Sequence, residues 1–318
     1  MSDAQEAAHG VVATIGAFDG VHRGHQELLR QVVERARALG CDSMAVTFDP
    51  HPDLVLYPDR HLTELSDPER KRELMRALGI SHVVVFEFTP EFSMLRPEEF
   101  IGRLQAQKPL RELWVGSDFA LGRGRSGTIA ALAEIGGAQD FALHVLPPVR
   151  VQREVISSTY IRTLLAQGEL RRANELLGHR YALSGTVVPG AGRGRTIDVP
   201  TANIQVPAVR TLPADGVYAA LVPLDGRLWP AVVNVGGRPT FGEAERQIEI
   251  HLLDFTGDLY GRRLLVEFVE RLRETKRFNA IDELRDQIGR DIAQARALPE
   301  LASAAERPAG EVGERASA

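Results

Sequence analysis

The chain has 318 residues, 44% of them hydrophobic, and a formal net charge of −5 at pH 7. This length is too great for one comfortable core, so we expect two domains. The acidic balance argues against non-specific nucleic-acid binding, and no apolar run approaches membrane-spanning length. The single cysteine, Cys41, excludes an internal disulfide, and the first residues lack the pattern of a signal peptide. We therefore expect a cytoplasmic globular protein, a monomer or weak homo-oligomer, that acts on small molecules and binds neither nucleic acid nor membranes.

Residues 11–150 alternate between strand-like and helix-like patterns. Short apolar runs predict strands at 11–16, 43–48, 82–88, 112–119 and 141–149. The amphipathic segment after the first run ends at Gly40, a residue typical of a helix C-terminus. This alternation predicts an α/β domain whose parallel sheet is covered on both faces. In such sheets, ligands bind beyond the carboxyl ends of the strands.

The pattern changes after two short helices, which we expect at 158–167 and 169–177. From about residue 181, short strands divided by Gly, Pro and Asp turns predict a small antiparallel barrel or sandwich. A last helix is expected from about Asn279. The residues after Pro299 are small, polar and aperiodic, which is typical of a disordered tail. We therefore expect domains at 1–180 and 181–298 and a tail at 299–318.

The first candidate site is GAFDGVHRGH (16–25), which joins the first strand to the following helix. As zinc ligands, His22 and His25 would need a third or fourth partner, and no cysteine cluster supplies one. His51 could be a third ligand, but it lies in a separate strand-end loop. As core residues, two histidines beside an arginine would pack poorly. An anion site fits better, because glycines let the backbone approach a phosphate while the helix N-terminus and imidazoles supply donors.

Three further stretches are expected at the same edge of the sheet. They are TFDPHP (47–52), the glycine-rich loop 114–127 with Asp118, Arg123 and Arg125, and the helix start 155–165 with Ser157, Ser158, Thr159 and Arg162. By itself the loop could be a surface turn with solvated charges, and the helix start an ordinary cap. One hydroxyl suffices for a cap, whereas three hydroxyls and an arginine suit a polyphosphate.

Together, G-x-F-D-G-V-H-x-G-H, FDPHP, V-G-x-D-F-x-x-G-x-x-R-x-G and S-S-T-x-I-R resemble the Rossmann-like HxGH nucleotidyltransferases. Over 11–178 the chain is similar to the FMN adenylyltransferase half of the bacterial bifunctional riboflavin kinase/FAD synthetase family. The resemblance implies attack of an FMN phosphate oxygen on the ATP α-phosphorus, with His22 and His25 as the catalytic pair on the ATP phosphates. The positions it assigns to ATP binding are Gly16, Phe18, Asp19, Gly20, His22, Gly24, His25, Asp118, Arg125, Ser158, Thr159 and Arg162.

The second candidate site lies in the region of short strands. Four glycines and two arginines within 185–204 could cover a phosphate, or could form a loose hairpin loop. In PTAN (200–203), Thr201 and Asn203 alternate onto one side of an extended segment, and their oxygens suit Mg²⁺ with a nucleotide. Glu249 alternates with isoleucines along a later strand. It faces either a barrel interior, where it would need a use, or solvent, which is commoner for glutamate.

This region, 181–298, looks like the riboflavin kinase domain of the same family, a six-stranded antiparallel barrel with a C-terminal helix. The resemblance implies that Thr201 and Asn203 bind Mg²⁺–ATP and that Glu249 is the catalytic base toward the riboflavin 5′-hydroxyl. The positions assigned to ATP or flavin in this domain are Gly185, Gly190, Gly194, Arg195, Thr201, Asn203 and Glu249. One departure is that Asp198-Val199 replaces the usual Gly-Phe before PTAN, and this carboxylate could weaken ATP binding.

The leading hypothesis is a bifunctional enzyme of FAD biosynthesis that uses ATP and Mg²⁺, with riboflavin, FMN and FAD as substrates and products. In one alternative, the kinase-like domain only binds flavin or regulates an active adenylyltransferase. In another, the adenylyltransferase acts on a different phosphorylated metabolite, such as a pantetheine or nicotinamide mononucleotide.

Overall fold

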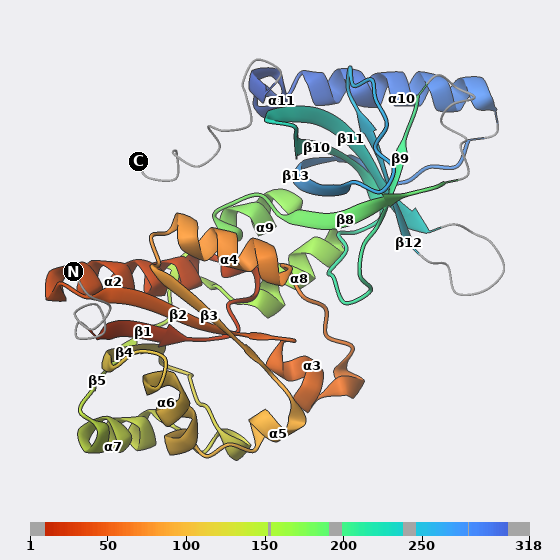
Figure 1. The fold of residues 1–318 in the computed structure, drawn as a ribbon. Coiled ribbons are helices and arrows are strands. Elements are labelled where there is room, and N and C mark those ends of the chain that lie inside the picture. Colours follow the sequence, from red (N-terminus) through yellow and green to blue (C-terminus); the bar gives the residue numbers. More distant parts are fainter. Residues whose placement is uncertain (1–9, 152–153, 191–198, 238–245, 279, 305–318) are drawn as a thin grey trace. The chain divides into compact units, whose positions relative to one another are not determined.

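The computed structural model describes residues 10–151, 154–190, 199–237, 246–278 and 280–304. The chain forms two compact units, Met1–Ser158 (unit 1) and Thr159–Ala318 (unit 2) (Figure 1). None of the helices within the described residues has the length and apolarity needed to cross a membrane.

Unit 1 contains a five-stranded parallel sheet in the order β3-β2-β1-β4-β5. Its strands are β1 (Val11–Ile15), β2 (Asp42–Asp49), β3 (His82–Glu87), β4 (Leu110–Gly116) and β5 (Ala142–Leu146). All of β1 is buried, as expected for the central strand of a sheet covered on both sides. The predicted α/β architecture is therefore confirmed.

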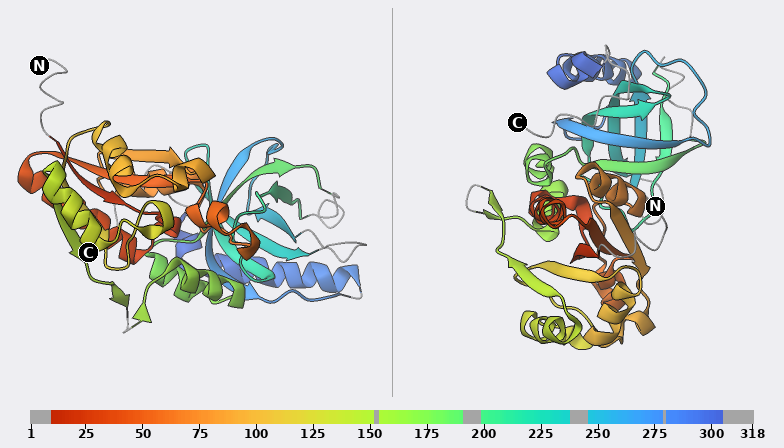
Figure 2. Two further views of the ribbon diagram at one scale, coloured as in Figure 1. Left: turned by 90° about the horizontal axis from the view of Figure 1, so that it is seen from below. Right: turned by 60° about the vertical axis from the view of Figure 1, so that its left-hand side comes forward.

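Helices cover both faces of this sheet (Figures 1 and 2). The helical segments of unit 1 are η2 (Asp19–Val21), α2 (Arg23–Leu39), α3 (Pro52–Leu56), η3 (Pro58–Arg60), α4 (Pro68–Ala77), α5 (Pro90–Ser93), α6 (Pro97–Gln105), η4 (Arg123–Arg125) and α7 (Ile129–Gln139). Alternate residues of β1 enter different cores. Ala13 packs in the cluster that includes α6 and α7, and Val12 packs with α2 and α4. A two-stranded ribbon, β6 (Arg150–Val151) with β7 (Glu154–Val155), completes the unit.

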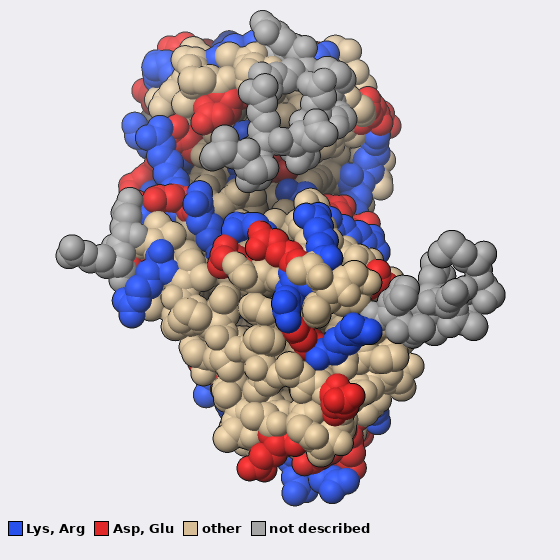
Figure 3. All heavy atoms as spheres, turned by 90° about the vertical axis from the view of Figure 1, so that its left-hand side faces the viewer, with Lys and Arg blue, Asp and Glu red and all other residues tan. Residues whose placement is uncertain are grey.

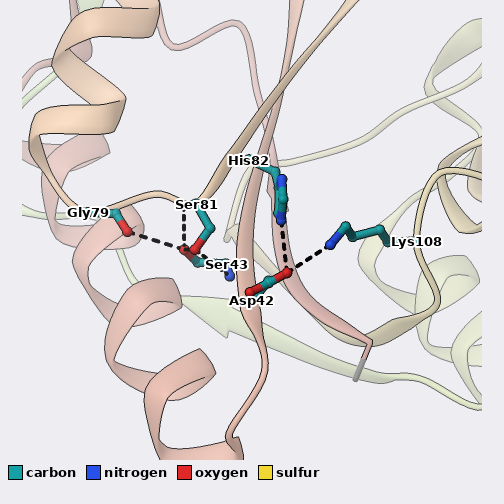
Figure 4. A network of polar contacts seen from close by, with 6 residues as sticks. All are labelled: Asp42, Ser43, Gly79, Ser81, His82 and Lys108. Atoms are coloured by element: carbon teal, nitrogen blue, oxygen red, sulfur yellow. Dashed lines mark hydrogen bonds and ion pairs between the residues drawn. The ribbon is translucent and has the colours of Figure 1, made fainter. Parts of the chain in front are cut away.

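A polar network joins the amino ends of β2 and β3 (Figure 4). The Asp42 carboxylate lies 2.9 Å from His82 Nε2 and 2.8 Å from Lys108 Nζ, and the hydroxyls of Ser43 and Ser81 are 3.1 Å apart. The hydrogen bonds from Lys108 and then His82 hold the pKa of Asp42 below its ordinary value. These contacts fix the edge of the sheet that lies opposite the carboxyl ends of its strands.

Unit 2 is built around a closed barrel of six antiparallel strands in the order β10-β11-β12-β9-β8-β13. These strands are β8 (Ala182–Val188), β9 (Ala202–Gln205), β10 (Gly216–Leu224), β11 (Arg227–Gly237), β12 (Arg246–Leu252) and β13 (Arg263–Arg273). Closure leaves no open sheet edge, so the barrel satisfies its own backbone hydrogen bonds. The expected barrel is confirmed.

The two compact units divide after Ser158, because two helices pack with the barrel, and the domain boundary near residue 180 stays a prediction. These helices are α8 (Ser158–Gln167) and α9 (Leu170–Leu177). Asn174 in α9 donates to Phe268 O at 3.0 Å and accepts from Tyr181 N at 2.7 Å. The carbonyl of Leu165 accepts from Ala214 N at 2.8 Å.

The C-terminal helix α10 (Ile281–Arg296) packs along the outside of β10 and β11, as Figure 1 shows. Asp291 of α10 is buried and receives a bidentate pair of hydrogen bonds from Arg273, the shortest 2.7 Å long. A second helix, α11 (Pro299–Ala304), follows it. This corrects the expectation of disorder from residue 299, because Leu301 and Ala304 are buried in the same core as β10. Residues 305–318 lie outside the described part.

We predict that Leu301→Ala destabilises unit 2 by about 2–4 kcal/mol, the usual result of emptying a core leucine site. Leu301 is 0% exposed, and its side chain helps to close the core beneath α10 and α11. Urea unfolding followed by fluorescence measures this change. Leu56→Ala, which truncates a leucine that is 46% exposed, is the matched control. Equal stability of the two variants would show that α11 contributes nothing to the fold.

Candidate active sites

The first site lies at the carboxyl ends of β1 and β2, where the sheet order brings two loops together. Gly16 N donates to Val46 O at 3.0 Å, which continues the pairing of β1 and β2 beyond the end of β1. Thr47 Oγ1 then donates to Ala17 O at 3.0 Å. The turn 16–25 therefore begins directly beside TFDPHP, as the strand order predicts.

The turn after β1 is held in shape by Asp19. Its carboxylate accepts from Leu65 N at 2.9 Å and 3.0 Å and from Ser66 N at 3.2 Å, and the residue is 3% exposed. Ser66 Oγ in turn accepts from Gly20 N at 3.0 Å, and Ser158 Oγ donates to Asp19 O at 2.9 Å. Because both carboxylate oxygens bind backbone N–H groups, this geometry favours a structural role for Asp19. Its predicted contact with ATP stays a prediction.

Phe18 and Gly20 give the turn its sharp reversal. Phe18 has φ 49° and Gly20 has φ 78°, both in the left-handed region that an ordinary residue avoids. The Phe18 ring is buried beneath the turn and meets the His25 ring edge-on, with centroids 5.2 Å apart. The strained conformation therefore places an apolar support under one of the two predicted catalytic imidazoles.

His22 and His25 stand together at the N-terminus of α2. His22 caps the helix, because its Nδ1 accepts from His25 N at 3.3 Å. The two rings stack with centroids 3.6 Å apart and planes 14° apart. Gly24 lies against this pair, since a Cβ at that position would be 3.2 Å from the His22 ring. The helix N-terminus and two imidazoles thus form one cluster of hydrogen-bonding groups.

Burial keeps His25 neutral at pH 7. Loss of solvation, and next the charges of His22 and Lys71, hold the pKa of His25 well below its ordinary value of 6.5. The Nδ1 atom of His25 is buried without a hydrogen-bond partner among the described residues. A buried polar atom without a partner is costly, and a bound ligand that pairs with it would remove this cost.

The loop after β4 brings Asp118 and Arg125 together. Arg125 Nη2 donates to Asp118 O at 2.9 Å, and a bridge between Leu121 and Gly127 closes the loop. Since β4 is the neighbour of β1, this loop leaves the same edge of the sheet as the turn 16–25.

Thr159 and Arg162 belong to unit 2, and their part in the first site stays a prediction.

In the barrel, strand register places Glu249 between two asparagines. Glu249 of β12 lies opposite Asn203 of β9 and opposite Asn234 of β11. Cross-strand partners share one face of a sheet, so the PTAN segment and the predicted base point to the same side. That side is the half-buried one, because Ile248 and Ile250 occupy the buried face of β12.

Asn203 has the features expected of a ligand to a nucleotide-bound cation. Its Oδ1 is buried without a hydrogen-bond partner among the described residues, whereas Thr201 is exposed two residues earlier. His251 Nδ1 lies 2.8 Å from Pro200 O and fixes the PTAN segment to β12. An unpartnered amide oxygen and a nearby hydroxyl are the oxygen donors that Mg²⁺ accepts, so these residues fit the cation.

Glycines at two predicted positions allow close approach of the backbone. A Cβ at Gly190 would lie 1.9 Å from Asn203 Nδ2, and one at Gly185 would lie 2.7 Å from Gln205 O. The chain therefore passes close to Asn203 at Gly190, and a side chain there would displace the Asn203 amide. The predicted residues Gly194 and Arg195, and the departure at Asp198, lie outside the described residues.

Sequence reasoning missed Lys71, which lies at the first site. Its Nζ donates to Ala17 O at 3.1 Å and to Phe48 O at 3.2 Å, and the residue is 4% exposed. In the sequence it belongs to a charged helix and is indistinguishable from a solvated lysine by composition. Its spacing of four residues from the buried Met75 is the signal that could have placed it on the inner face of α4.

We predict that His25 makes the protein less stable in mild acid. The unfolded chain takes up the His25 proton near pH 6.5, whereas the folded protein resists it, so the free energy of unfolding falls as the pH drops below about 6.5. His25→Asn should therefore lose less stability than the parent between pH 7 and pH 5, measured by urea unfolding at each pH. His61→Asn, which removes an exposed imidazole, is the control. If the free energy of unfolding changed with pH equally in the parent and in His25→Asn, the lowered pKa of His25 would be contradicted.

Comparison with known families also divides the chain into two regions. A family model described as FAD synthetase matches residues 4–160, and one described as riboflavin kinase matches residues 177–298. A crystal structure described as a macrolide-efflux protein from Streptococcus pneumoniae shares 30% identity and a TM-score of 0.81. It covers 91% of this chain and 95% of its own.

Three relatives that match over most of their length carry the same name. Proteins called bifunctional riboflavin kinase/FMN adenylyltransferase are 39% identical in Pseudomonas fluorescens, 38% in Escherichia coli K12 and 35% in Bacillus subtilis. The matches cover 91%, 92% and 92% of this chain and 93%, 94% and 93% of the relatives. The FAD synthetase region contains the His22–His25 cluster, and the riboflavin kinase region contains the Asn203–Glu249 pair. This chain therefore belongs to the family of bifunctional riboflavin kinase/FMN adenylyltransferases.

Proposed function

We propose that the chain phosphorylates riboflavin to FMN in its barrel and then adenylylates FMN to FAD in unit 1, with ATP as the donor in both steps. One observation carries this proposal: each of the two family regions contains its own polar cluster, the stacked His22 and His25 in the first and the cross-strand pair Asn203 and Glu249 in the second. The functional boundary is proposed near residue 180, between the end of the first family region at 160 and the barrel strand that opens at Ala182.

In unit 1, the reaction forms a bond between an FMN phosphate oxygen and the α-phosphorus of ATP. The bond from that phosphorus to the β-phosphate oxygen breaks, and pyrophosphate leaves. The N-terminus of α2 offers free N–H groups and the positive end of the helix dipole to the polyphosphate. Neutral His25 and capping His22 add hydrogen-bonding groups there, so positioning and charge stabilisation account for the rate.

A cluster of aromatic rings supports a flavin site beside this polyphosphate site. The rings lie at the carboxyl ends of β2 and β3 and on the helices that follow, and their centroids are 5.5–6.3 Å apart: Phe48, Phe86, Phe88, Phe92 and Phe100. Phe88 and Phe92 are only partly buried, so they offer ring surface to a planar heterocycle. The sequence analysis did not predict this cluster, because Phe48 joins the other four rings only when β2 pairs with β3.

In the barrel, Glu249 accepts the proton of the riboflavin 5′-hydroxyl as its oxygen attacks the γ-phosphorus of ATP. The γ-phosphoryl group moves to that oxygen, and ADP leaves. Thr201 and Asn203 would hold Mg²⁺ with the nucleotide. The cation supplies neutralisation of phosphate charge when bound. Because Glu249 and Asn203 are cross-strand partners, the base and the nucleotide site keep a fixed separation.

This assignment fits better than the alternatives. A regulatory kinase-like domain is favoured only by Asp198-Val199 in place of Gly-Phe, whereas the Asn203–Glu249 pair is intact. An adenylyltransferase for another metabolite would have no use for a riboflavin kinase region on the same chain.

Small molecules are the proposed partners. On the face in Figure 3, Lys and Arg side chains are interspersed with Asp and Glu, which supports small substrates rather than a polyanion. The lone Cys41 supports a cytoplasmic location. A monomeric or weakly associating protein remains part of the proposal.

Incubation of the purified chain with riboflavin, ATP and Mg²⁺ should yield FMN first and FAD later, separated by chromatography. Removal of Mg²⁺ with a chelator should stop both steps. Formation of FAD from added FMN without any phosphorylation of riboflavin would overturn the kinase assignment and favour the regulatory alternative.

Glu249→Gln should lower riboflavin phosphorylation at least about 100-fold, the range expected for loss of a general base. FAD formation from added FMN should stay at the parent rate, because Glu249 lies in the other unit. Glu300→Gln, an exposed change of the same charge in unit 2, is the control. Loss of both activities together in Glu249→Gln would refute two separate sites.

A further inference from the structure

Lys71 is a buried cation at the first site to which no role has been assigned. It projects from α4, and its ammonium donates to Ala17 O at 3.1 Å and to Phe48 O at 3.2 Å. Ala17 belongs to the turn that ends in the two histidines, and Phe48 lies at the end of β2, next to the loop that follows this strand. One side chain therefore bridges the two loops on which the adenylyltransferase site depends.

The surroundings of Lys71 make this bridge rigid. Ala17 O also accepts from Thr47 Oγ1 at 3.0 Å, so the ammonium and the hydroxyl hold the same carbonyl. α4 itself begins at Asp67, whose side chain caps the helix by accepting from Arg70 N at 2.8 Å. Just before this cap, Leu65 and Ser66 bind the Asp19 carboxylate. The start of α4 thus contacts the turn 16–25 through its backbone and through Lys71.

Burying a lysine at 4% exposure is costly unless its charge is used or well paired. A methionine of similar length would fill the same space on the inner face of α4, next to buried Met75. Hydrogen bonds to two strand-end carbonyls explain the geometry of the ammonium, and its position beside the histidines points to a use.

We propose that Lys71 is a positioning residue for adenylyl transfer: its ammonium holds the turn 16–25 against the end of β2 and places a fixed positive charge beside His25. The inference rests on the proposed adenylyltransferase function and goes beyond it, because no predicted site residue lies on α4. Its charge acts on His25 together with that of His22, the other group whose charge lowers the pKa of His25.

Lys71 therefore has two effects that can be separated. First, the two hydrogen bonds of the ammonium act as a clamp that fixes the distance between the turn 16–25 and the end of β2. Displacement of reacting groups by about 1 Å can cost about 100-fold in rate. The charge adds to burial and to the charge of His22 in lowering the pKa of His25, so its loss should make protonation easier and move the acid limb of activity to higher pH. A merely structural lysine would leave that limb unchanged.

The test compares Lys71→Met with Lys71→Arg in the full chain. Lys71→Met should lower kcat/KM for FAD formation from FMN and ATP about 10- to 100-fold and shift the acid limb of its pH profile upward. Lys71→Arg should lower the rate because a guanidinium cannot take the place of the ammonium, yet keep the parent pH profile. Riboflavin phosphorylation in the same preparations should be unchanged and reports that the chain is folded.

Arg72→Met is the matched control, since it removes one positive charge from an exposed neighbouring position of α4. A Lys71→Met variant with parent kcat/KM, or with reduced activity and an unshifted pH profile, would overturn the inference. If Lys71→Met does not fold, parent-like rates in Lys71→Arg would overturn the clamp. If the parent itself makes no FAD from FMN, the proposed function fails. The His25 titration followed by NMR in parent and Lys71→Met then still tests the charge, and an unchanged pKa would overturn it.

Discussion

The first site depends on backbone groups that neither strand nor helix can satisfy. Where β1 ends and α2 begins, the chain reverses so sharply that its carbonyls and amides point away from the sheet ladder. Side chains take over their pairing: Asp19 accepts amides from the segment before α4, and Lys71 donates to carbonyls at the ends of two strands. Because these partners come from a distant segment, the site forms only when the whole α/β unit is folded. The histidines are then presented on a rigid frame rather than on a loose loop.

In the barrel, the proposed site residues are positioned by the register of the strands. Antiparallel pairing fixes Asn203 opposite Glu249 without any loop, so the proposed base and nucleotide ligand are set by the backbone ladder. Gly190, which follows β8, lies close to Asn203, where a Cβ would come within 1.9 Å of Asn203 Nδ2. Unit 1 thus positions its site residues by hydrogen bonds from side chains at a turn. Unit 2 positions its site residues by the pairing of antiparallel strands.

Local patterns predicted the elements of this fold and most motifs, but not every partner. Alternating apolar runs predicted all five parallel strands, and the spacing of His22 and His25 placed them at a helix start. Three features were beyond reach, because each depends on contacts between distant segments. Lys71 looks like a solvated charge until α4 is docked, and the phenylalanine cluster spans separate strands and helices. The helix at 299–304 lacks periodicity because it is only six residues long and is stabilised by burial of Leu301. The division after Ser158 likewise reflects the docking of α8 and α9 rather than a change in composition.

The cap of α2 is a histidine rather than a serine or asparagine, and this choice limits which side chains can replace it in this chain. Nδ1 of His22 is occupied by the amide of His25, so a neutral ring must carry its proton on Nε2. Nδ1 caps the helix, and Nε2 is the donor of the same ring. A serine at this position would preserve the helix but remove the imidazole, and an arginine would preserve a charge but lose the cap. The helix cap and the proposed phosphate contact therefore use the same side chain, so a substitution that spares the cap can still remove the contact.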